Sequence, residues 1–134
     1  MRRLTGRWVR KAEDDLIGAR ELAQSRPPLH ELICFHCQQS AEKYLKAVLE
    51  ERGIAIPKTH NLDDLGNLLA PHHAALSALR RGLIFLTDFA VGTRYPGKNA
   101  TKRQAHAALR WATRVRQACR AALGVPPPRR RKSA

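Results

Sequence analysis

Hydrophobic residues recur along most of the chain at steps of three and four positions, a spacing that places them on one face of an α-helix. The pattern predicts a first helix over residues 5–24, with Thr5 as its N-cap, and a second over residues 29–51. Ser25-Arg26-Pro27-Pro28 separates the two, because proline blocks helix continuation. The apolar face of the second helix is broad, which is typical of a central helix contacted on more than one side.

The remaining pattern predicts three more helices. Asn61 is expected to cap a short helix, a long helix is predicted over residues 73–91, and a last one over residues 100–123 with Asn99 as its cap. No strand signal longer than a few residues occurs between them. The sequence therefore predicts an all-α fold, an antiparallel up-and-down bundle of four long helices plus one short helix.

The length of 134 residues fits one domain, predicted over residues 1–124. Residues 125–134 are rich in Pro and Arg and are expected to form a disordered tail, either a nucleic-acid arm or a solubilising end. The N-terminus lacks the apolar segment of a signal peptide, and no apolar run approaches the ~18 residues that cross a bilayer. We therefore expect a cytoplasmic protein without membrane contact.

The cysteines do not indicate a metal site. Cys34 and Cys37 flank His36, but a lone C-x-x-C lacks the second pair of ligands that a structural zinc site needs. We expect both thiols to pack as apolar side chains. His72 and His73 have no third ligand in view, and the sequence predicts neither a metal nor another cofactor.

Charge is distributed very unevenly along the chain. The sequence holds 25 Lys and Arg against 11 Asp and Glu, a formal net charge of +14. All the acidic residues lie at or before Asp88, whereas 12 of the basic residues follow it. Such a surface favours a polyanionic partner, a nucleotide or RNA, because bound phosphates release counterions. The alternative is a solvated face that only keeps the protein soluble.

Several candidate nucleotide- or RNA-binding residues cluster in the loop before the last helix and in its first turn: Arg94, Tyr95, Lys98, Lys102 and Arg103. Arg can hold a phosphate bidentately, Tyr can stack on a base, and helix N–H groups favour anions. His106 can shuttle a proton, so Arg94 and His106 are the candidate catalytic residues of a metal-independent ribonuclease. Alternatively, Arg94 and Tyr95 only anchor the loop and His106 is a surface residue.

The second helix and the connector after it supply further candidate binding residues: Gln39, Lys43, Lys58 and His60. The amides and charges near Gln39 and Lys43, with Gln38 and Glu42, could read a base edge, tie helices together or line a dimer interface. His60 could instead stabilise its turn by a hydrogen bond. Paired catalytic carboxylates, Gly-rich phosphate loops and a Ser-His-Asp grouping are absent, so the chain cannot itself be a nucleotidyltransferase.

Three segments resemble the HEPN family (higher eukaryotes and prokaryotes nucleotide-binding domain). Residues 34–49, CFHCQQSAEKYLKAVL, are similar to its second-helix signature of a Gln pair, Ala-Glu-Lys and Leu-Lys-Ala. Thr59-His60-Asn61-Leu62 is similar to its Thr-His-(Asp/Asn)-Leu turn, and Arg94-Tyr95-Pro96 to its Arg-Tyr-Pro before the last helix. Order and spacing agree over roughly residues 5–123.

This resemblance implies a four- to five-helix bundle, commonly a homodimer and often encoded beside a minimal nucleotidyltransferase, its partner in a toxin–antitoxin or two-part transferase. Some members are metal-independent RNases, whose motif is an Arg, then four to six intervening residues, then a His, at the start of the last helix. Here Arg103 and His106 are three apart, and Arg94 and His106 are twelve apart. The predicted function is a nucleotide- or RNA-binding partner of a nucleotidyltransferase; the alternatives are an RNase toxin and a dimerising scaffold without nucleotide binding.

Overall fold

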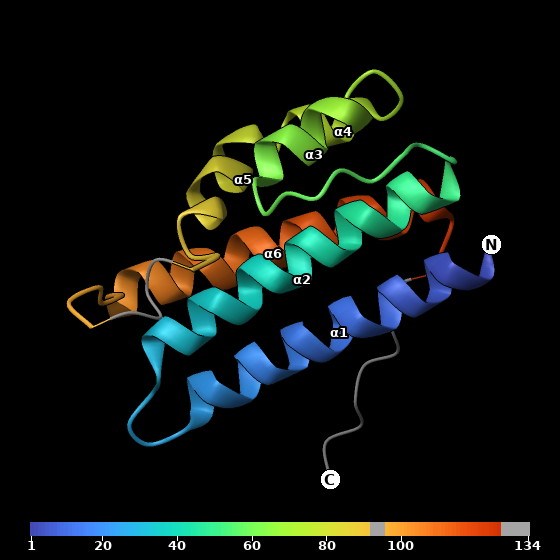
Figure 1. The fold of residues 1–134 in the computed structure, drawn as a ribbon. Coiled ribbons are helices and arrows are strands. Elements are labelled where there is room, and N and C mark those ends of the chain that lie inside the picture. The colour runs from blue at the N-terminus through green and yellow to red at the C-terminus, as the bar shows by residue number, and fades with distance from the viewer. Residues whose placement is uncertain (92–95, 127–134) are drawn as a thin grey trace, which may run out of the picture.

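The computed structural model describes residues 1–91 and 96–126, and within them the regular structure is helical throughout, without a strand (Figure 1). The helices are α1 (Arg3–Gln24), α2 (His30–Glu51), α3 (Leu62–Leu69), α4 (Ala74–Ser77), α5 (Arg80–Thr87) and α6 (Lys102–Leu123). The prediction of an all-α antiparallel bundle is confirmed. No helix in the described part of the chain is long and apolar enough to cross a membrane.

Three helices of 22 residues form the base of the bundle, with α1 antiparallel to both α2 and α6. α2 and α6 run in the same direction: Glu31 at the start of α2 accepts a hydrogen bond from Ala100 N (3.3 Å), and Tyr44 further along accepts one from Arg120 (3.3 Å). α3, α4 and α5 cover the side of α2 and α6 that faces away from α1 (Figure 1).

α2 is the central helix, as its broad apolar face predicted. It contacts α1, α3, α5 and α6, and 12 of its residues are buried. α6 meets it through a seam of small side chains, which allow the two helix axes to approach closely: Ala105, Ala108, Ala112, Val115 and Cys119. Cys34 and Cys37 are fully buried in this core, so the prediction that both thiols pack as apolar side chains is confirmed. Burial raises the pKa of the Cys34 thiol to about 12.

The start of α1 differs from the prediction that Thr5 caps the helix. α1 begins at Arg3, and Thr5 lies buried inside it, with its hydroxyl donating to Glu51 Oε1 (3.1 Å). The same carboxylate accepts from Arg2 N at 2.8 Å. The helix start is therefore held by an acid at the end of α2, which local capping rules do not anticipate.

The fourth predicted helix, over residues 73–91, is broken into α4 and α5, so the bundle has three long helices and three short ones among its described residues. Its seam of leucines is nevertheless buried as predicted: Leu76, Leu79, Leu83 and Leu86. The three-and-four spacing survives because the turn between α4 and α5 is tight. Apolar periodicity alone does not reveal such a break.

The cap of the short helix is confirmed, because the Asn61 side chain accepts from Asp63 N (3.0 Å) and Asp64 N (3.4 Å). The predicted cap of the last helix, Asn99, is wrong. α6 is capped by Thr101, whose hydroxyl accepts from Gln104 N (3.0 Å) while the Gln104 amide oxygen accepts from Thr101 N (2.9 Å). This reciprocal capping box is readable in the sequence as Thr-x-x-Gln.

Replacement of Thr101 by alanine is expected to lower the free energy of unfolding by about 1 kcal/mol, because the Gln104 N–H in the first turn of α6 loses the hydroxyl that accepts from it. Urea denaturation followed by circular dichroism measures the change. Asn99→Ala is the matched control and is expected to change stability by less than about 0.5 kcal/mol. Equal losses for the two variants would contradict the assignment of the cap.

Gly82 marks the place where α5 meets α6. A Cβ built on Gly82 would lie 2.1 Å from Trp111 Cε3, so the indole ring occupies the space that a side chain would fill. Gly82→Ala is therefore expected to destabilise the fold by about 2 kcal/mol and to shift the tryptophan fluorescence. Gly18→Ala on α1, where a Cβ meets nothing within 4 Å, should instead stabilise slightly. Unchanged stability of the Gly82 variant would show that the ring is free to move.

Candidate nucleic-acid interface

One face of α6 carries a row of exposed basic side chains, which we call the α6 basic face: Lys102, Arg103, His106, Arg110 and Arg114. Lys102, His106, Arg110 and Arg114 follow one another at four-residue steps, and such positions lie on the same side of a helix, with a rise of about 6 Å per step. The row therefore extends over about 18 Å of helix length.

The surface along this row is hollowed by two open depressions. Lys102, Arg103, His106 and Arg110 line the first, of about 480 Å³. The second, of about 340 Å³, lies next to it and is lined by Leu109, Arg110, Thr113 and Arg114. Arg110 belongs to both, so the basic side chains border one shallow, continuous strip.

The charges of this face are not neutralised within the described part of the chain. None of Lys102, Arg103, His106 and Arg110 forms an ion pair or a side-chain hydrogen bond there. The Arg114 guanidinium lies over the Trp111 ring, 5.1 Å from its centroid, and its other face is exposed. Unpaired cations in a row attract a polyanion rather than stabilise the fold.

Other arginines of α6 point into the bundle instead. Arg116 holds Glu13 of α1 bidentately, with Nε 2.5 Å from Oε1 and Nη2 3.0 Å from Oε2. Tyr44 of α2 donates its hydroxyl to the same carboxylate, and Arg120 lies 3.3 Å from the Tyr44 oxygen. Burial alone would raise the pKa of Glu13, but the hydrogen bonds and charges of Arg116, Tyr44 and Arg120 outweigh it and lower that pKa. The positive charge of α6 thus divides into an outer, unpaired part and an inner, structural part.

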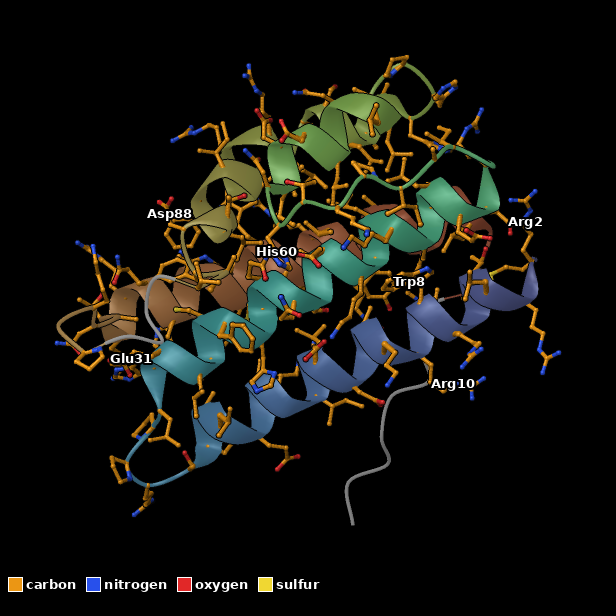
Figure 2. The ribbon with its side chains drawn as sticks, in the orientation of Figure 1. Arg2, Trp8, Arg10, Glu31, His60 and Asp88 are labelled. Atoms are coloured by element: carbon orange, nitrogen blue, oxygen red, sulfur yellow. The ribbon has the colours of Figure 1, made fainter. Side chains whose placement is uncertain are left out.

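The candidate residues on α2 and the connector contribute to a different arrangement, centred on Glu42. Its buried carboxylate accepts from His60 Nδ1 (2.8 Å) and Gln38 Nε2 (3.1 Å) through Oε1, and from Lys46 Nζ (3.0 Å) through Oε2. Gln38 also donates to the His60 carbonyl at 3.2 Å. Burial favours a raised pKa for Glu42, but the three hydrogen bonds prevail and lower it. The network fastens the connector to α2, beside which His60 lies (Figure 2).

Gln39 and Lys43 also have partners within the bundle. Gln39 donates to the Gln38 side chain at 2.7 Å, and the Lys43 ammonium pairs with Asp15 of α1. Asp15 additionally accepts from His36 Nδ1 at 3.0 Å, which ties α1 to α2. The sequence left open whether these residues read a base, tie helices together or line a dimer interface. The Lys43 contact ties α2 to α1, whereas the Gln39 contact stays within α2.

The structure therefore brings only some of the predicted site residues together. Lys102, Arg103 and His106 line one depression. Gln39, Lys43 and His60 instead bond to other side chains of the bundle, namely Gln38, Asp15 and Glu42. Lys58 and Lys98 are exposed in loops. Arg94 and Tyr95, and with them the predicted Arg94–His106 pair, lie outside the described residues, as does the tail from residue 127. Sequence reasoning missed Arg110 and Arg114, whose four-residue spacing from His106 was the available signal.

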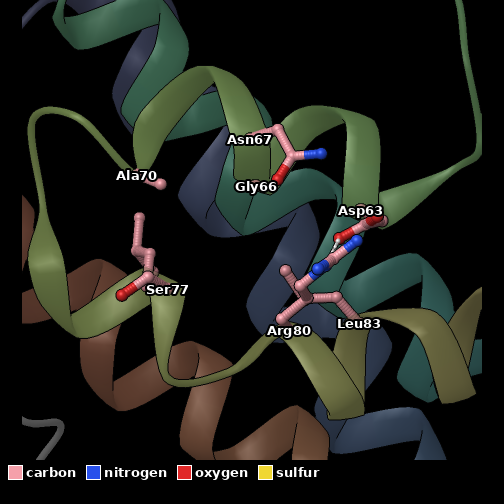
Figure 3. Close-up of a pocket in the computed structure, with 8 residues that line it drawn as sticks. Asp63, Gly66, Asn67, Ala70, Ser77, Arg80 and Leu83 are labelled. Carbon is pink, nitrogen blue, oxygen red and sulfur yellow. Dashed lines mark hydrogen bonds and ion pairs between the residues drawn. The ribbon is translucent and has the colours of Figure 1, made fainter.

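A small cavity between α3 and the α4–α5 segment offers no alternative site for a nucleotide. It encloses about 50 Å³ next to Gly66, Ser77 and Leu83, and the ion pair of Arg80 Nε with Asp63 Oδ1 (3.2 Å) lies at its edge (Figure 3). Small-molecule sites enclose roughly 300–1,000 Å³, so this cavity is a packing gap between short helices.

The fold and the charged face together define a class: a small, basic, all-α bundle built on a central helix. The sequence matches the HEPN domain family over residues 5–122, and the protein belongs to that family. The crystal structure of ST0689, an archaeal HEPN homologue, superposes with a TM-score of 0.68 at 29% sequence identity, covering 90% of this chain and 98% of that one. Among curated proteins, no match was found.

Proposed function

We propose that this HEPN protein binds RNA through the phosphate backbone, which lies along the α6 basic face. The observation that carries the proposal is the row of exposed basic side chains on α6, of which Lys102, Arg103 and Arg110 have no acidic partner among the described residues. No acidic residue follows Asp88, so α6 contributes no charge that would repel a phosphate.

The described face offers charge rather than a stacking surface. Its aromatic ring, Trp111, packs against Gly82 and is covered by the Arg114 guanidinium. Contacts to phosphates position a nucleic acid but carry no sequence information. Binding is therefore expected to depend strongly on salt and weakly on base sequence.

The proposal includes a separately encoded minimal nucleotidyltransferase as the protein partner, in a toxin–antitoxin-like pair. HEPN proteins are often paired with such enzymes, and this chain lacks the carboxylates of nucleotidyl transfer. The partner and the proposed homodimer are tested by expression of the chain alone and together with a minimal nucleotidyltransferase, followed by size-exclusion chromatography with light scattering.

The direct test is fluorescence anisotropy with a labelled single-stranded RNA, measured over a series of salt concentrations. Four phosphate contacts would give a slope of log K against log salt of about −2.8, and Arg110→Ala should reduce its magnitude by about 0.7. Arg10→Ala is the matched control, since this exposed arginine projects from α1 away from the bundle (Figure 2). Equal effects of the two substitutions, or binding that is insensitive to salt, would contradict the proposal and favour a scaffold that only binds protein.

A ribonuclease is the second candidate, favoured by one observation: His106 is exposed among Lys102, Arg103 and Arg110. An imidazole can move a proton while neighbouring cations stabilise the charge that develops on phosphorus. The protein should be incubated with RNA in EDTA beside His106→Ala and Arg94→Ala. If the wild type cleaves RNA and both substitutions abolish the cleavage, the protein is a metal-independent ribonuclease. If the RNA stays intact, the proposal that the protein only binds RNA stands.

A further inference from the structure

A second group of basic side chains lies at the end of α2, at the opposite end of α6 from Lys102 (Figure 1). Arg52, the C-cap residue that follows α2, places Nη2 3.1 Å from His72 Nδ1 and Nη1 3.4 Å from His73 Nε2. The two histidines come from the turn between α3 and α4. We call Arg52, His72 and His73 the Arg52 cluster.

The cluster is not neutralised by any described acid. Within the described residues, no carboxylate lies within 4.0 Å of its three side chains. The acids nearest in sequence are Glu50 and Glu51, and both are engaged by Arg2: Glu51 accepts from its backbone N–H at 2.8 Å, and Glu50 pairs with its guanidinium at 3.9 Å.

The elements around the cluster place no described carboxylate within ion-pair distance of it. α4, α5 and α6 contain no acidic residue at all, and their ionisable groups are basic: Arg80, Arg81, Lys102, Arg103, His106, Arg110, Arg114, Arg116 and Arg120. On α3, Asp63 and Asp64 lie in the first turn, remote from the end that leads to His72, and Asp63 is paired with Arg80. The connector after α2 carries only Lys58 and His60.

The hydrogen bonds inside the cluster fix its protonation state. A guanidinium has no acceptor, so His72 Nδ1 and His73 Nε2 must each present a lone pair to Arg52. Both rings are therefore neutral in this arrangement. Consistent with this, burial and the charge of Arg52 lower the pKa of His73. The two rings accept from Arg52 N–H groups that could otherwise donate to an anion.

We propose that Arg52, His72 and His73 form a binding site for a phosphate group, in which the guanidinium holds two phosphate oxygens and the two imidazoles donate to the others. Bidentate pairing with phosphate is the geometry that Arg favours. Once the anion accepts from Arg52, both imidazoles are released and take up protons, because a nearby negative charge favours their charged form. Phosphate binding at the Arg52 cluster is thus coupled to proton uptake.

The proposal is independent of the α6 basic face and is tested on the full chain with inorganic phosphate and, in parallel, sulfate, whose charge is constant between pH 6 and pH 8. The imidazole signals of His72 and His73 are followed by NMR. Sulfate should bind at least about tenfold more tightly at pH 6 than at pH 8, and both anions should raise the titration midpoints of the two histidines. Midpoints that neither anion moves would overturn the proposal.

Two variants separate binding from loop packing. Arg52→Gln and His72→Asn should each weaken sulfate binding at pH 6 by at least about tenfold, whereas the control Arg81→Gln, an exposed arginine on α5, should leave it unchanged. Circular dichroism verifies that the variants are folded. If His72→Asn, folded as judged by its spectrum, binds sulfate like the wild type, the cluster is a structural clamp and the proposal is wrong.

The source of the phosphate is decided by a further arm with labelled RNA. If Arg52→Gln weakens both inorganic phosphate and RNA binding, the site holds a backbone phosphate of an RNA strand. If it weakens only inorganic phosphate binding, the site holds a free phosphate or a phosphate monoester. If Arg110→Ala does not change RNA binding, the proposal that RNA binds the α6 basic face is wrong. The binding of inorganic phosphate to the Arg52 cluster is measured without RNA, so this result does not decide the second proposal.

Discussion

Replacement of Glu13 by alanine is expected to lower the free energy of unfolding by about 3 kcal/mol, the largest effect of a single substitution that we predict. The carboxylate is the shared acceptor for Arg116 and Tyr44, and through Tyr44 it also orders Arg120. The side chains of Glu13, Arg116 and Arg120 are only 21%, 13% and 13% exposed. Removal of the acid leaves two poorly solvated guanidinium groups without a counter-charge, which is costly in a protein interior.

The measurement is urea denaturation of Glu13→Ala beside Asp14→Ala, its exposed neighbour on α1. The control should change stability by no more than about 0.5 kcal/mol. In the double variant Glu13→Ala/Arg116→Ala, part of the loss should be recovered, because one unpaired cation is removed together with its partner. Additive losses would show that the two side chains do not act as a pair.

This network also shows what the sequence does not reveal. Glu13 and Arg116 are separated by 103 positions, and their pairing depends on how α1 and α6 rotate against α2. Helix periodicity predicts which face of each helix is buried, but it does not predict which polar residues at the edge of that face meet. From sequence, Arg116 was one of many basic residues after Asp88.

The helices themselves were largely predictable. α2 begins and ends within about one residue of its predicted limits, and α3 begins directly after its predicted cap, because Pro28 and Asn61 leave clear local signals. Errors occurred where a tertiary contact replaces a local one, as when Glu51 holds the start of α1, and where a break preserves the apolar spacing, as between α4 and α5.

The candidate site was predictable in part, for the same physical reason. Lys102, Arg103 and His106 were identified because local charge near a helix start is visible in the sequence, and the structure places them around one depression. Gln39, Lys43 and His60 were selected by residue type, and residue type does not reveal their partners in the fold, which are Gln38 on the same helix, Asp15 on α1 and Glu42 on α2. Only the folded contacts make that distinction.

Glu42 provides the second large effect. Glu42→Gln keeps the shape of the side chain but removes the charge that accepts from His60, Lys46 and Gln38. We expect a loss of about 2 kcal/mol at pH 7, because the new amide nitrogen faces donors and Lys46, only 12% exposed, loses its counter-ion. Glu50→Gln is the control, since its 3.9 Å pair with exposed Arg2 contributes no more than about 0.5 kcal/mol.

The loss should depend on pH in one direction. The folded-state pKa of Glu42 lies below the ordinary value of 4.5, so the carboxylate contributes its full stability above that value and loses it as the pH falls through the folded pKa. The stability difference between wild type and Glu42→Gln should thus decrease below about pH 4.5. Denaturant titrations at pH 7, 5, 4 and 3 measure this difference directly. A difference that stays constant down to pH 3 would contradict the assignment of this stability to the negative charge of Glu42.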